Sequence, residues 1–395
     1  MLVKYIVLPL SMSYSKIFSV KPEPVITLWY MLHEIPDQRR AQGKRHDLPT
    51  LLTLAILALC CGHTSYQSMQ EWCENYQEKM IQQVPFLAGH MPHSATFHRV
   101  FASLDVKVFE EVVGKWLQAI IPLEKGEGIA LDGKEIHGTG VCLVAAFAHV
   151  AKSVLFEEGT DMKGKELIIG PDVLKHITIK DHVITGDALF AQRSLCDQIT
   201  KEHGGYVFRV KGNQETMEQD IRLFFNDLPF GAKVQSYTTV DRWKGQIEKR
   251  EVKVSSEITD YLSWPGLTHV WWMKKMVTKD GKTSTTESVG IASLPEKIIG
   301  NKVVVEEVVS YIRGHWGIET RLHRTRDVVF GEDKATIRKG HAPQTMAVLR
   351  NIVISIFHRG TVRNFKSAMR HFAAKPDKLF AFLGLTAVAQ TVTIA

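Results

Sequence analysis

Three acidic residues stand in sequence contexts that suit phosphodiester chemistry. Asp132 lies in GIALDGKEI and Asp187 in HVITGDALF, where each carboxylate ends or interrupts a short apolar run. Glu319 lies in YIRGHWGIETRLH, inside a long helical pattern. Carboxylates are preferred ligands of Mg²⁺, and two such ions about 3.5–4 Å apart activate the attacking oxygen and stabilise the leaving oxygen. We therefore expect these three acids to bind two Mg²⁺ ions, or Mn²⁺ in their place.

The two aspartates also have ordinary structural explanations. An Asp-Gly pair after an apolar run, such as Asp132-Gly133, often forms a turn. Asp187 could cap a helix that begins at Ala188, because an aspartate side chain accepts hydrogen bonds from the first free backbone N–H groups. For each aspartate, the metal-binding and structural interpretations therefore both stand at this point.

Glu319 shares one face of its predicted helix with the apolar residues Val305, Val308, Ile312 and Trp316, given 100° of rotation per residue. This spacing predicts that Glu319 faces the core. A buried carboxylate is costly unless it is paired or binds a metal. The residues alone leave two explanations open, a metal ligand and an ion pair with a neighbouring arginine.

The order of the predicted elements indicates a mixed α/β core that would position the acids. Strands are expected over Gly128–Ile136, Val141–Val150, Ser153–Glu158, His182–Thr185 and Gly205–Val210. Helices are expected over Leu167–His176 and residues 190–203, and later over Val303–Arg326 and Pro343–Phe357. The acids at 132 and 187 thus fall on the first and fourth strands, in a β-β-β-α-β-α-β order.

The same patterns predict how the chain divides into domains. Residues 1–25 are expected to be an N-terminal extension, and 26–120 a helical domain with helices over Pro49–Cys61 and Ser65–Met80 and one or two more over Ala95–Ile120. The catalytic core would occupy 126–357. Within it, the runs VQSYTTV, KREVKVS, THVWWMKKMVT and TESVGIAS predict a β-rich insertion at about 231–294. Residues 358–395 remain as a C-terminal tail.

Charge and composition favour an acidic partner. The chain has 395 residues, 45% of them hydrophobic, and carries a net charge of +7, as expected of a globular protein that contacts nucleic acid. The five cysteines include no CxxC pair, which indicates reduced, buried thiols in the cytoplasm. The longest apolar run, Leu51–Cys61, is shorter than the roughly 20 residues that span a bilayer. Motifs for phosphate loops, nucleophile elbows and zinc sites are absent.

The blocks around the three acids resemble one known group, the bacterial H-repeat-associated transposases, a branch of the DDE insertion-sequence transposases. The similarity covers nearly all of residues 33–357. IPDQRRAQGKRHDLPTLLTLAILAL and SATFHRVFASLD resemble the N-terminal associated domain of that group. IALDGKEIHG, HVITGDALFAQ with GGYVFRVKGNQ, and HWGIETRLHRTRDVVFGEDKATIRKGHAPQTMAVLRN resemble its three catalytic blocks.

The resemblance implies a ribonuclease-H-like fold in which Asp132, Asp187 and Glu319 form the metal-binding triad. It also places strands before the last acid, where the β-rich stretch lies. The residues Lys211-Gly212-Asn213-Gln214 match a KGNQ block that would lie near the active site or DNA. A turn after a core strand is the alternative interpretation of that block.

The chain also departs from the wider pattern. Insertion-sequence transposases place Tyr, Arg, Glu and Lys at fixed spacings around the last acid, but here His315 stands four residues before Glu319 and Arg326 seven after it. Where the group often has His-Gly-Arg-Ile-Glu, this chain has KGQIE at residues 244–248.

The expected function is therefore DNA transposition: hydrolysis at the ends of an insertion element, then strand transfer into target DNA. Double-stranded DNA would be the partner, a homodimer would assemble on it, and the protein would be cytoplasmic and nucleoid-associated. Eight Lys and Arg against four Asp and Glu within 311–350 favour phosphate contacts. The expected DNA-binding residues are Arg313, Arg321, Arg324, Lys334, Arg338, Lys339, Lys211 and Asn213. The alternatives are a Mg²⁺-dependent nuclease without strand transfer and a non-catalytic DNA-binding relative.

Overall fold

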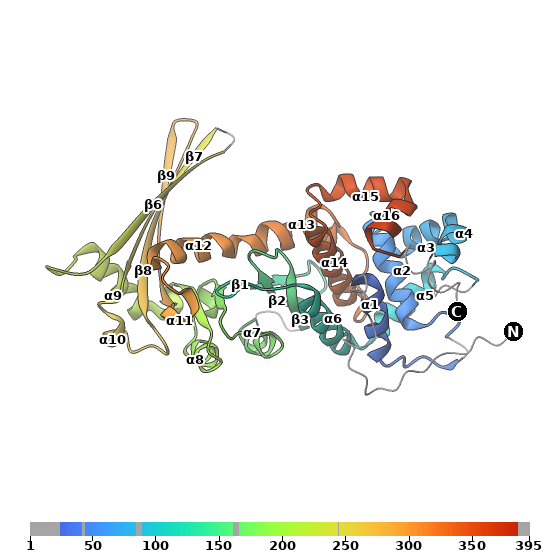
Figure 1. Ribbon diagram of the computed structural model, residues 1–395, viewed down its shortest axis with the longest axis horizontal. Helices are drawn as coiled ribbons and strands as arrows, with labels where there is room; N and C mark the ends of the chain where they lie inside the picture. The colour runs from blue at the N-terminus through green and yellow to red at the C-terminus, as the bar shows by residue number, and fades with distance from the viewer. Residues whose placement is uncertain (1–23, 42–43, 84–88, 161–165, 244, 386–395) are drawn as a thin grey trace.

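The computed structural model describes residues 24–41, 44–83, 89–160, 166–243 and 245–385 (Figure 1). Most of the predicted N-terminal extension, 1–25, lies outside the described residues. The chain then forms α1 (Pro24–Met31), a short 3₁₀ helix (Leu32–Glu34), α2 (Leu48–Cys60), α3 (Tyr66–Asn75), α4 (Gln77–Gln83), α5 (Ser94–Ser103) and α6 (Val106–Ile120). These helices gather at one end of the molecule.

Two of the predicted helical segments each contain two helices. The predicted helix Ser65–Met80 breaks at Tyr76, whose hydroxyl donates a hydrogen bond to the carbonyl of Ala373 at 2.9 Å. The predicted run Ala95–Ile120 becomes α5 and α6, because the Asp105 side chain accepts a hydrogen bond from the backbone N–H of Val108 at 3.3 Å and starts a new helix.

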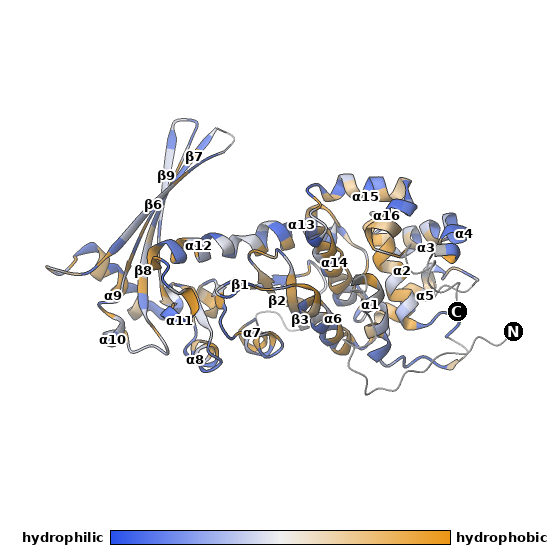
Figure 2. Cartoon of the chain, viewed as in Figure 1, coloured by the Kyte–Doolittle hydropathy of each residue, from blue (hydrophilic) through white to orange (hydrophobic). Residues whose placement is uncertain are grey.

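Helix α2 lies at the centre of the helical region. All of its residues are buried, as expected for a helix that is apolar on every face. It contacts α1, α3, α14 (Ala342–Arg359) and α15 (Phe365–Ala374), and α16 (Pro376–Phe382) packs on α15. The expected C-terminal tail, 358–395, therefore contains two packed helices in its described part. Figure 2 shows hydrophobic residues concentrated in α2 and in the sheet.

Nine strands of the described chain form one sheet, in the order β3-β2-β1-β4-β5-β9-β8-β7-β6. The first five are β1 (Gly128–Glu135), β2 (Cys142–Ala148), β3 (Val154–Thr160), β4 (Val183–Gly186) and β5 (Gly205–Val210). β1 runs antiparallel to β2 and parallel to β4, and β4 runs parallel to β5. The predicted mixed α/β arrangement is confirmed.

The β-rich stretch continues this sheet. It consists of β6 (Gln235–Trp243), β7 (Gln246–Ser255), β8 (His269–Lys279) and β9 (Lys282–Ser293), all antiparallel. β9 pairs with β5, with Tyr206 opposite Ser293 and Val210 opposite Val289. The far ends of these strands extend beyond the body as a twisted, largely hydrophilic ribbon (Figures 1 and 2). Helix α9 (Glu215–Asn226), which the sequence analysis did not predict, joins β5 to β6.

The remaining helices lie against the sheet. α7 (Glu166–Lys175) contacts β2 and β3, and α8 (Arg193–Lys201) contacts β5; α10 (Thr259–Leu262) and α11 (Glu296–Ile299) are short. The predicted helix Val303–Arg326 is not uniform. It consists of α12 (Val304–Gly317), a π-helical turn (Ile318–His323) and α13 (Arg324–Val328). It crosses β1, β4 and β5 and links the outer strands to the helical region (Figure 1).

A single large core joins the helical region to the sheet. It includes Leu54 of α2, Phe109 of α6, Leu131 of β1 and Leu349 of α14. A second core lies under α12 and holds Trp271 and Val308. The five cysteines are buried and unpaired, as predicted. Within the described residues, no helix has the length and apolar character needed to cross a membrane.

Candidate active site

The register of the parallel strands β1 and β4 brings two of the three acids to one edge of the sheet. Leu131 pairs with Gly186, so Asp132 and Asp187 follow at the same level. Asp132 lies within β1, opposite Ala145 of β2, and does not form the turn that an Asp-Gly pair suggests. Asp132 is therefore a strand residue and not part of a turn.

Asp187 has the capping role that its sequence allowed. Its Oδ1 accepts a hydrogen bond from the backbone N–H of Leu189 at 2.8 Å, and it begins a short 3₁₀ helix, Ala188–Phe190, rather than a long α-helix. The side chain is half-buried and also lines the cavity described below. The cap orients the carboxylate and leaves its Oδ2 free of that bond, so the two interpretations of Asp187 are compatible.

Glu319 does not face the core, and that prediction is wrong. Its side chain is 53% exposed, and Trp316, placed on the same stripe, is 57% exposed. Trp316 already departs from the predicted stripe within α12, before the π-helical turn Ile318–His323 begins, so the buried side of the helix is not the one that carries Ile312, Trp316 and Glu319. Ile318 and Leu322 take the buried side, and Glu319 turns toward the cavity.

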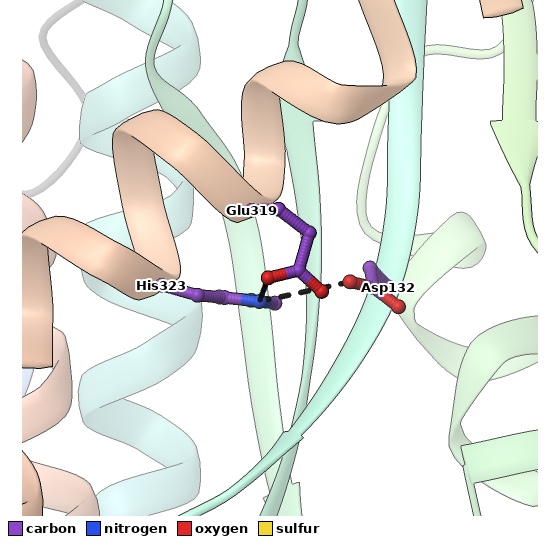
Figure 3. Close-up of side chains that lie close together, drawn as sticks. All are labelled: Asp132, Glu319 and His323. Carbon is purple, nitrogen blue, oxygen red and sulfur yellow. Dashed lines mark ion pairs between the residues drawn. The ribbon is translucent and has the colours of Figure 1, made fainter. Parts of the chain in front are cut away.

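His323 lies within ion-pair distance of the carboxylates of both Asp132 and Glu319 (Figure 3). Its Nδ1 is 3.6 Å from Oδ2 of Asp132 and 3.7 Å from Oε2 of Glu319. One ligand atom from each of the three side chains lies within 4.8 Å of the other two, close enough for all three to hold one metal ion. The sequence left open an ion pair between Glu319 and an arginine. In the structure the side chain that lies beside Glu319 is His323 instead.

Burial and like charge shape the protonation of the acids. Burial raises the pKa of Asp132 to about 7; the His323 imidazole opposes this, whereas the carboxylates of Glu319 and Asp187 add to it. The same imidazole lowers the pKa of the more exposed Glu319. The buried carboxylate of Asp132 thus has too little positive charge around it, and a divalent cation would supply that charge.

The three acids line one cavity of about 710 Å³ between the carboxyl ends of β1, β4 and β5, helix α12 and the strands β7 to β9. Cationic side chains line it as well: Arg209, Lys211, Arg250, Lys275 and Arg313. Three of these have acidic partners. Arg250 and Lys275 pair with Glu248, and Arg313 lies 3.0 Å from Asp241 of β6. Nε of Arg209 is buried without a hydrogen-bond partner among the described residues.

The expected DNA-binding residues are not all in one place. Lys211 and Arg313 line the cavity, whereas Arg321 is half-buried and its charge lies near His149 and His358. Asn213 donates a hydrogen bond to the carbonyl of Ala188 at 2.6 Å, which ties the KGNQ turn to the residues after Asp187. The others are exposed outside the cavity lining: Arg324, Lys334, Arg338 and Lys339. Lys244 lies outside the described residues.

Sequence reasoning missed His323, Arg209 and Thr185. His323 carried a usable signal, because it stands four residues after Glu319 and neighbours at that spacing meet on a helix. Arg209 and Thr185 carried no such signal, because alternating strand residues point to opposite faces and only the fold reveals which face borders the cavity. Arg326, seven residues after Glu319, is fully buried and bonds to Glu157 and Glu332 at 2.6 and 2.9 Å.

Comparison with known proteins agrees with this geometry. Residues 123–356 match the family model described as "Transposase DDE domain", and residues 29–117 match the one described as "DDE_Tnp_1-associated". The "H repeat-associated putative transposase YhhI" of Escherichia coli (strain K12) is 27% identical over 354 residues, which is 85% of this chain and 91% of that protein. The "Putative transposase YncI" of Escherichia coli O157:H7 is 28% identical over 335 residues, 82% of this chain and 85% of that protein. The chain belongs to the family of transposases with a DDE domain.

Proposed function

We propose that this protein cleaves the phosphodiester bond at the ends of an insertion element and joins the released ends to target DNA. The observation that carries this proposal is the convergence of Asp132, Asp187 and Glu319 on one cavity, from two parallel strands and a helix. An uncompensated group of carboxylates beside cationic side chains suits a phosphodiester with bound divalent metal.

The sheet topology supports the ribonuclease-H-like core that the family resemblance implies. The five core strands lie in the order β3-β2-β1-β4-β5, with β2 antiparallel to β1 and with β1, β4 and β5 parallel. In such a sheet the carboxyl ends of β1 and β4 meet, and carboxylates placed there approach one another. The outer strands β6 to β9 then form one wall of the cavity.

The residues present fit a divalent metal. Asp132, Glu319 and His323 would hold one ion, and Asp187 with Asp132 would share a second. Oxygen ligands suit Mg²⁺, and an imidazole in the set is also compatible with Mn²⁺. When bound, the metal supplies Lewis acidity at the scissile phosphate and lowers the pKa of the attacking water.

The chemistry needs little from the protein beyond positioning and charge. In the first step, a water oxygen bonds to phosphorus while the bond to the 3′ oxygen breaks, which leaves a 3′-OH on the element. In the second step, the oxygen of that hydroxyl bonds to a phosphorus of target DNA while the bond from this phosphorus to the 3′ oxygen of the target strand breaks, which leaves a 3′-OH on the target. Asp132, Asp187 and Glu319 would orient the reacting groups in both steps.

Cationic side chains would hold the DNA backbone. Lys211, Arg209 and Arg313 line the same cavity as the acids. Phosphate contacts farther along the duplex would come from the exposed or half-buried residues Arg321, Arg324, Lys334, Arg338 and Lys339, with Asn213 holding the turn after β5. Because strand transfer needs two element ends together, we propose a homodimer on DNA.

The test uses the purified protein, Mg²⁺ and labelled duplexes that carry the candidate element ends. We expect nicking at the ends and joined products for the wild type, and neither for Asp132→Asn or Glu319→Gln. Asp172→Asn is the matched control, because this half-buried aspartate pairs with Lys175 of the same helix, α7, and lies outside the lining of the cavity. Nicking without joining would favour the nuclease alternative, and binding without nicking the non-catalytic one. Mutants as active as the wild type would overturn the catalytic assignment.

A further inference from the structure

A chain of hydrogen bonds connects three elements beside the site. Nε2 of His149, in the turn after β2, lies 3.0 Å from Oγ1 of Thr185 in β4. The same Thr185 oxygen lies 3.2 Å from Nδ1 of His315 in α12. Thr185 stands two residues before Asp187, and His315 four residues before Glu319. The chain therefore joins the strand and the helix that carry two of the acids.

His149 fits between two glycines. A Cβ on Gly128 of β1 would lie 2.3 Å from Nδ1 of His149, and one on Gly314 of α12 would lie 2.1 Å from the same atom. Real Cβ atoms do not approach so closely, so both positions need glycine. Across the described part of the chain, no hydrogen bond reaches this Nδ1, which faces the Cα atoms of the two glycines.

This packing sets the direction of the chain. Nδ1 of His149 lies against two glycines and meets no acceptor among the described residues, whereas Nε2 faces the Thr185 oxygen, so the proton of His149 belongs on Nε2. Nε2–H then donates to Thr185, and the single hydroxyl proton of Thr185 is left to donate to Nδ1 of His315. His315 accepts at Nδ1, and its own proton belongs on Nε2.

Both imidazoles are neutral, as this direction requires. Burial lowers the pKa of His149 to about 3. Burial also lowers the pKa of His315 to about 4, although the carboxylates of Asp187 and Glu319 oppose that shift. Each ring therefore carries one N–H, and its position is decided by hydrogen bonding alone.

His315 also lines the acid-lined cavity. Its Nδ1 is engaged by Thr185, and its Nε2 has no hydrogen-bond partner among the described residues. An N–H donor in a cavity lined by Arg209 and Lys211 suits an anionic oxygen, because charge-assisted hydrogen bonds to phosphate are strong.

We propose that His149, Thr185 and His315 form a one-directional hydrogen-bond chain that presents Nε2–H of His315 to a non-bridging oxygen of the bound phosphodiester. His315 contacts the substrate, whereas His149 and Thr185 are positioning residues that hold its tautomer. The inference rests on the proposed function only for the identity of the acceptor. The direction of the chain rests on the contacts of His149 and is tested separately.

The first test is the tautomeric state of the two rings, read from long-range ¹H–¹⁵N correlation spectra of the full-length protein with ¹⁵N-labelled histidine at pH 7.5. Wild-type His149 and His315 should both be Nε2–H. In Thr185→Val, His315 should lose its single tautomer and show both forms, while Thr185→Ser should keep the wild-type pattern. A proton on Nδ1 of His315 in the wild type would overturn the direction of the chain.

The second test measures end cleavage by the same variants. Loss of such a supporting hydrogen bond costs about 10–100-fold in activity. We expect Thr185→Val to lose cleavage in that range and Thr185→Ser to restore it. If the wild type does not cleave DNA, the proposed function is wrong, but the spectra still test the direction of the hydrogen-bond chain. If the wild type cleaves and Thr185→Val equals it, the positioning role is wrong.

Discussion

Two clusters of charged residues contain neighbouring parts of one helical segment, the π-helical turn with Glu319 and His323 and the following α13 with Arg326, and they differ in how charge is balanced. The first is the acid cluster, Asp132, Glu319 and His323, open to the cavity. The second is the buried ion network, in which Arg326 and Arg350 bond to Glu332 and Arg326 also bonds to Glu157. All four members of the network are buried.

The pKa values show what the difference means. In the ion network, burial alone would raise the pKa of Glu332, but the guanidinium groups of Arg326 and Arg350 lower it to about 2. In the acid cluster, burial raises the pKa of Asp132 to about 7 because nearby positive charge is scarce. Glu332, whose charge is balanced by arginines, therefore has a structural role. Asp132, whose charge is not balanced and which lines a cavity, is a candidate to bind a cation.

The largest expected effect is a separation of activity from stability. Asp132→Asn should reduce end cleavage on the order of 10³-fold or more, since a residue of a catalytic group acts as part of a unit. Its thermal midpoint should stay the same or rise, because the amide removes a poorly compensated buried carboxylate. Cleavage kinetics and thermal unfolding on one preparation check both. A large fall in the thermal midpoint would mean that Asp132 is a structural residue.

Glu332→Gln should show the opposite behaviour. Removing this anion leaves Arg326 and Arg350 buried without their shared partner, which should lower the free energy of unfolding by about 3–5 kcal/mol. Urea denaturation at pH 7 measures the loss. The matched control is Glu287→Gln, whose half-exposed carboxylate pairs with Lys274 on the outer strands and should change stability little. Equal losses for both would contradict the account of the network.

That stability difference should depend on pH with a definite sign. The folded pKa of Glu332, about 2, lies below its ordinary value of 4.5, so its ionised form stabilises the fold fully above pH 4.5. The contribution is lost as the pH falls from 4.5 toward 2. The difference in free energy of unfolding between wild type and Glu332→Gln should therefore become smaller from pH 4.5 to 4.0 to 3.5, as measured by urea denaturation. A constant difference over that window would mean that Glu332 is not held ionised by the arginines.

A smaller effect is expected in the helix that leads to both clusters. Gly314→Ala should lower the free energy of unfolding by about 1–3 kcal/mol, because its Cβ would meet His149 at 2.1 Å. Gly317→Ala should instead raise it by about 0.5–1 kcal/mol, because its nearest contact is an ordinary 3.5 Å to Phe147 and alanine favours helix. Denaturation curves of both variants test this, and a neutral Gly314→Ala would contradict the close packing.

The smallest effect distinguishes two arginines that are two residues apart. Arg324 is exposed, whereas Arg326 is buried in the ion network. Arg324→Gln should leave stability within about 0.5 kcal/mol of wild type. It should weaken DNA binding and reduce the slope of log affinity against log salt by about 0.9, the value for one phosphate contact. Fluorescence anisotropy across a salt series measures the slope, and an unchanged slope would remove Arg324 from the interface.

The sequence predicts the strands and most helices well, because periodicity and apolar runs mark them. Strands β1 to β5 and helices α2, α7 and α14 occur where expected. The side-chain pattern could not predict that β9 pairs with β5, since pairing between distant strands depends on the whole fold. Helix α9 was missed although Met217, Ile221 and Phe224 recur at helical spacing and form its buried side.

The candidate site could be predicted in its acids but not in its geometry. Asp132 and Asp187 were found because each ends or interrupts an apolar run, although Asp132 lies within β1 and not at its end. Glu319 was placed on the wrong face because Ile312 and Trp316 were taken to mark the buried side, whereas Ile318 and Leu322 are the buried residues there. The burial of Arg326 could not be predicted either, because its partner Glu157 lies 169 residues earlier in the sequence.

The central claim is that the acid cluster binds a divalent cation because its charge is uncompensated. The most direct measurement is Mn²⁺ binding to the full-length protein, followed by electron paramagnetic resonance of free Mn²⁺. The wild type and Asp172→Asn should bind the ion equally, and Asp132→Asn should lose that binding while it remains folded. A wild type that binds no Mn²⁺, or an Asp132→Asn variant that binds it as tightly, would contradict the account.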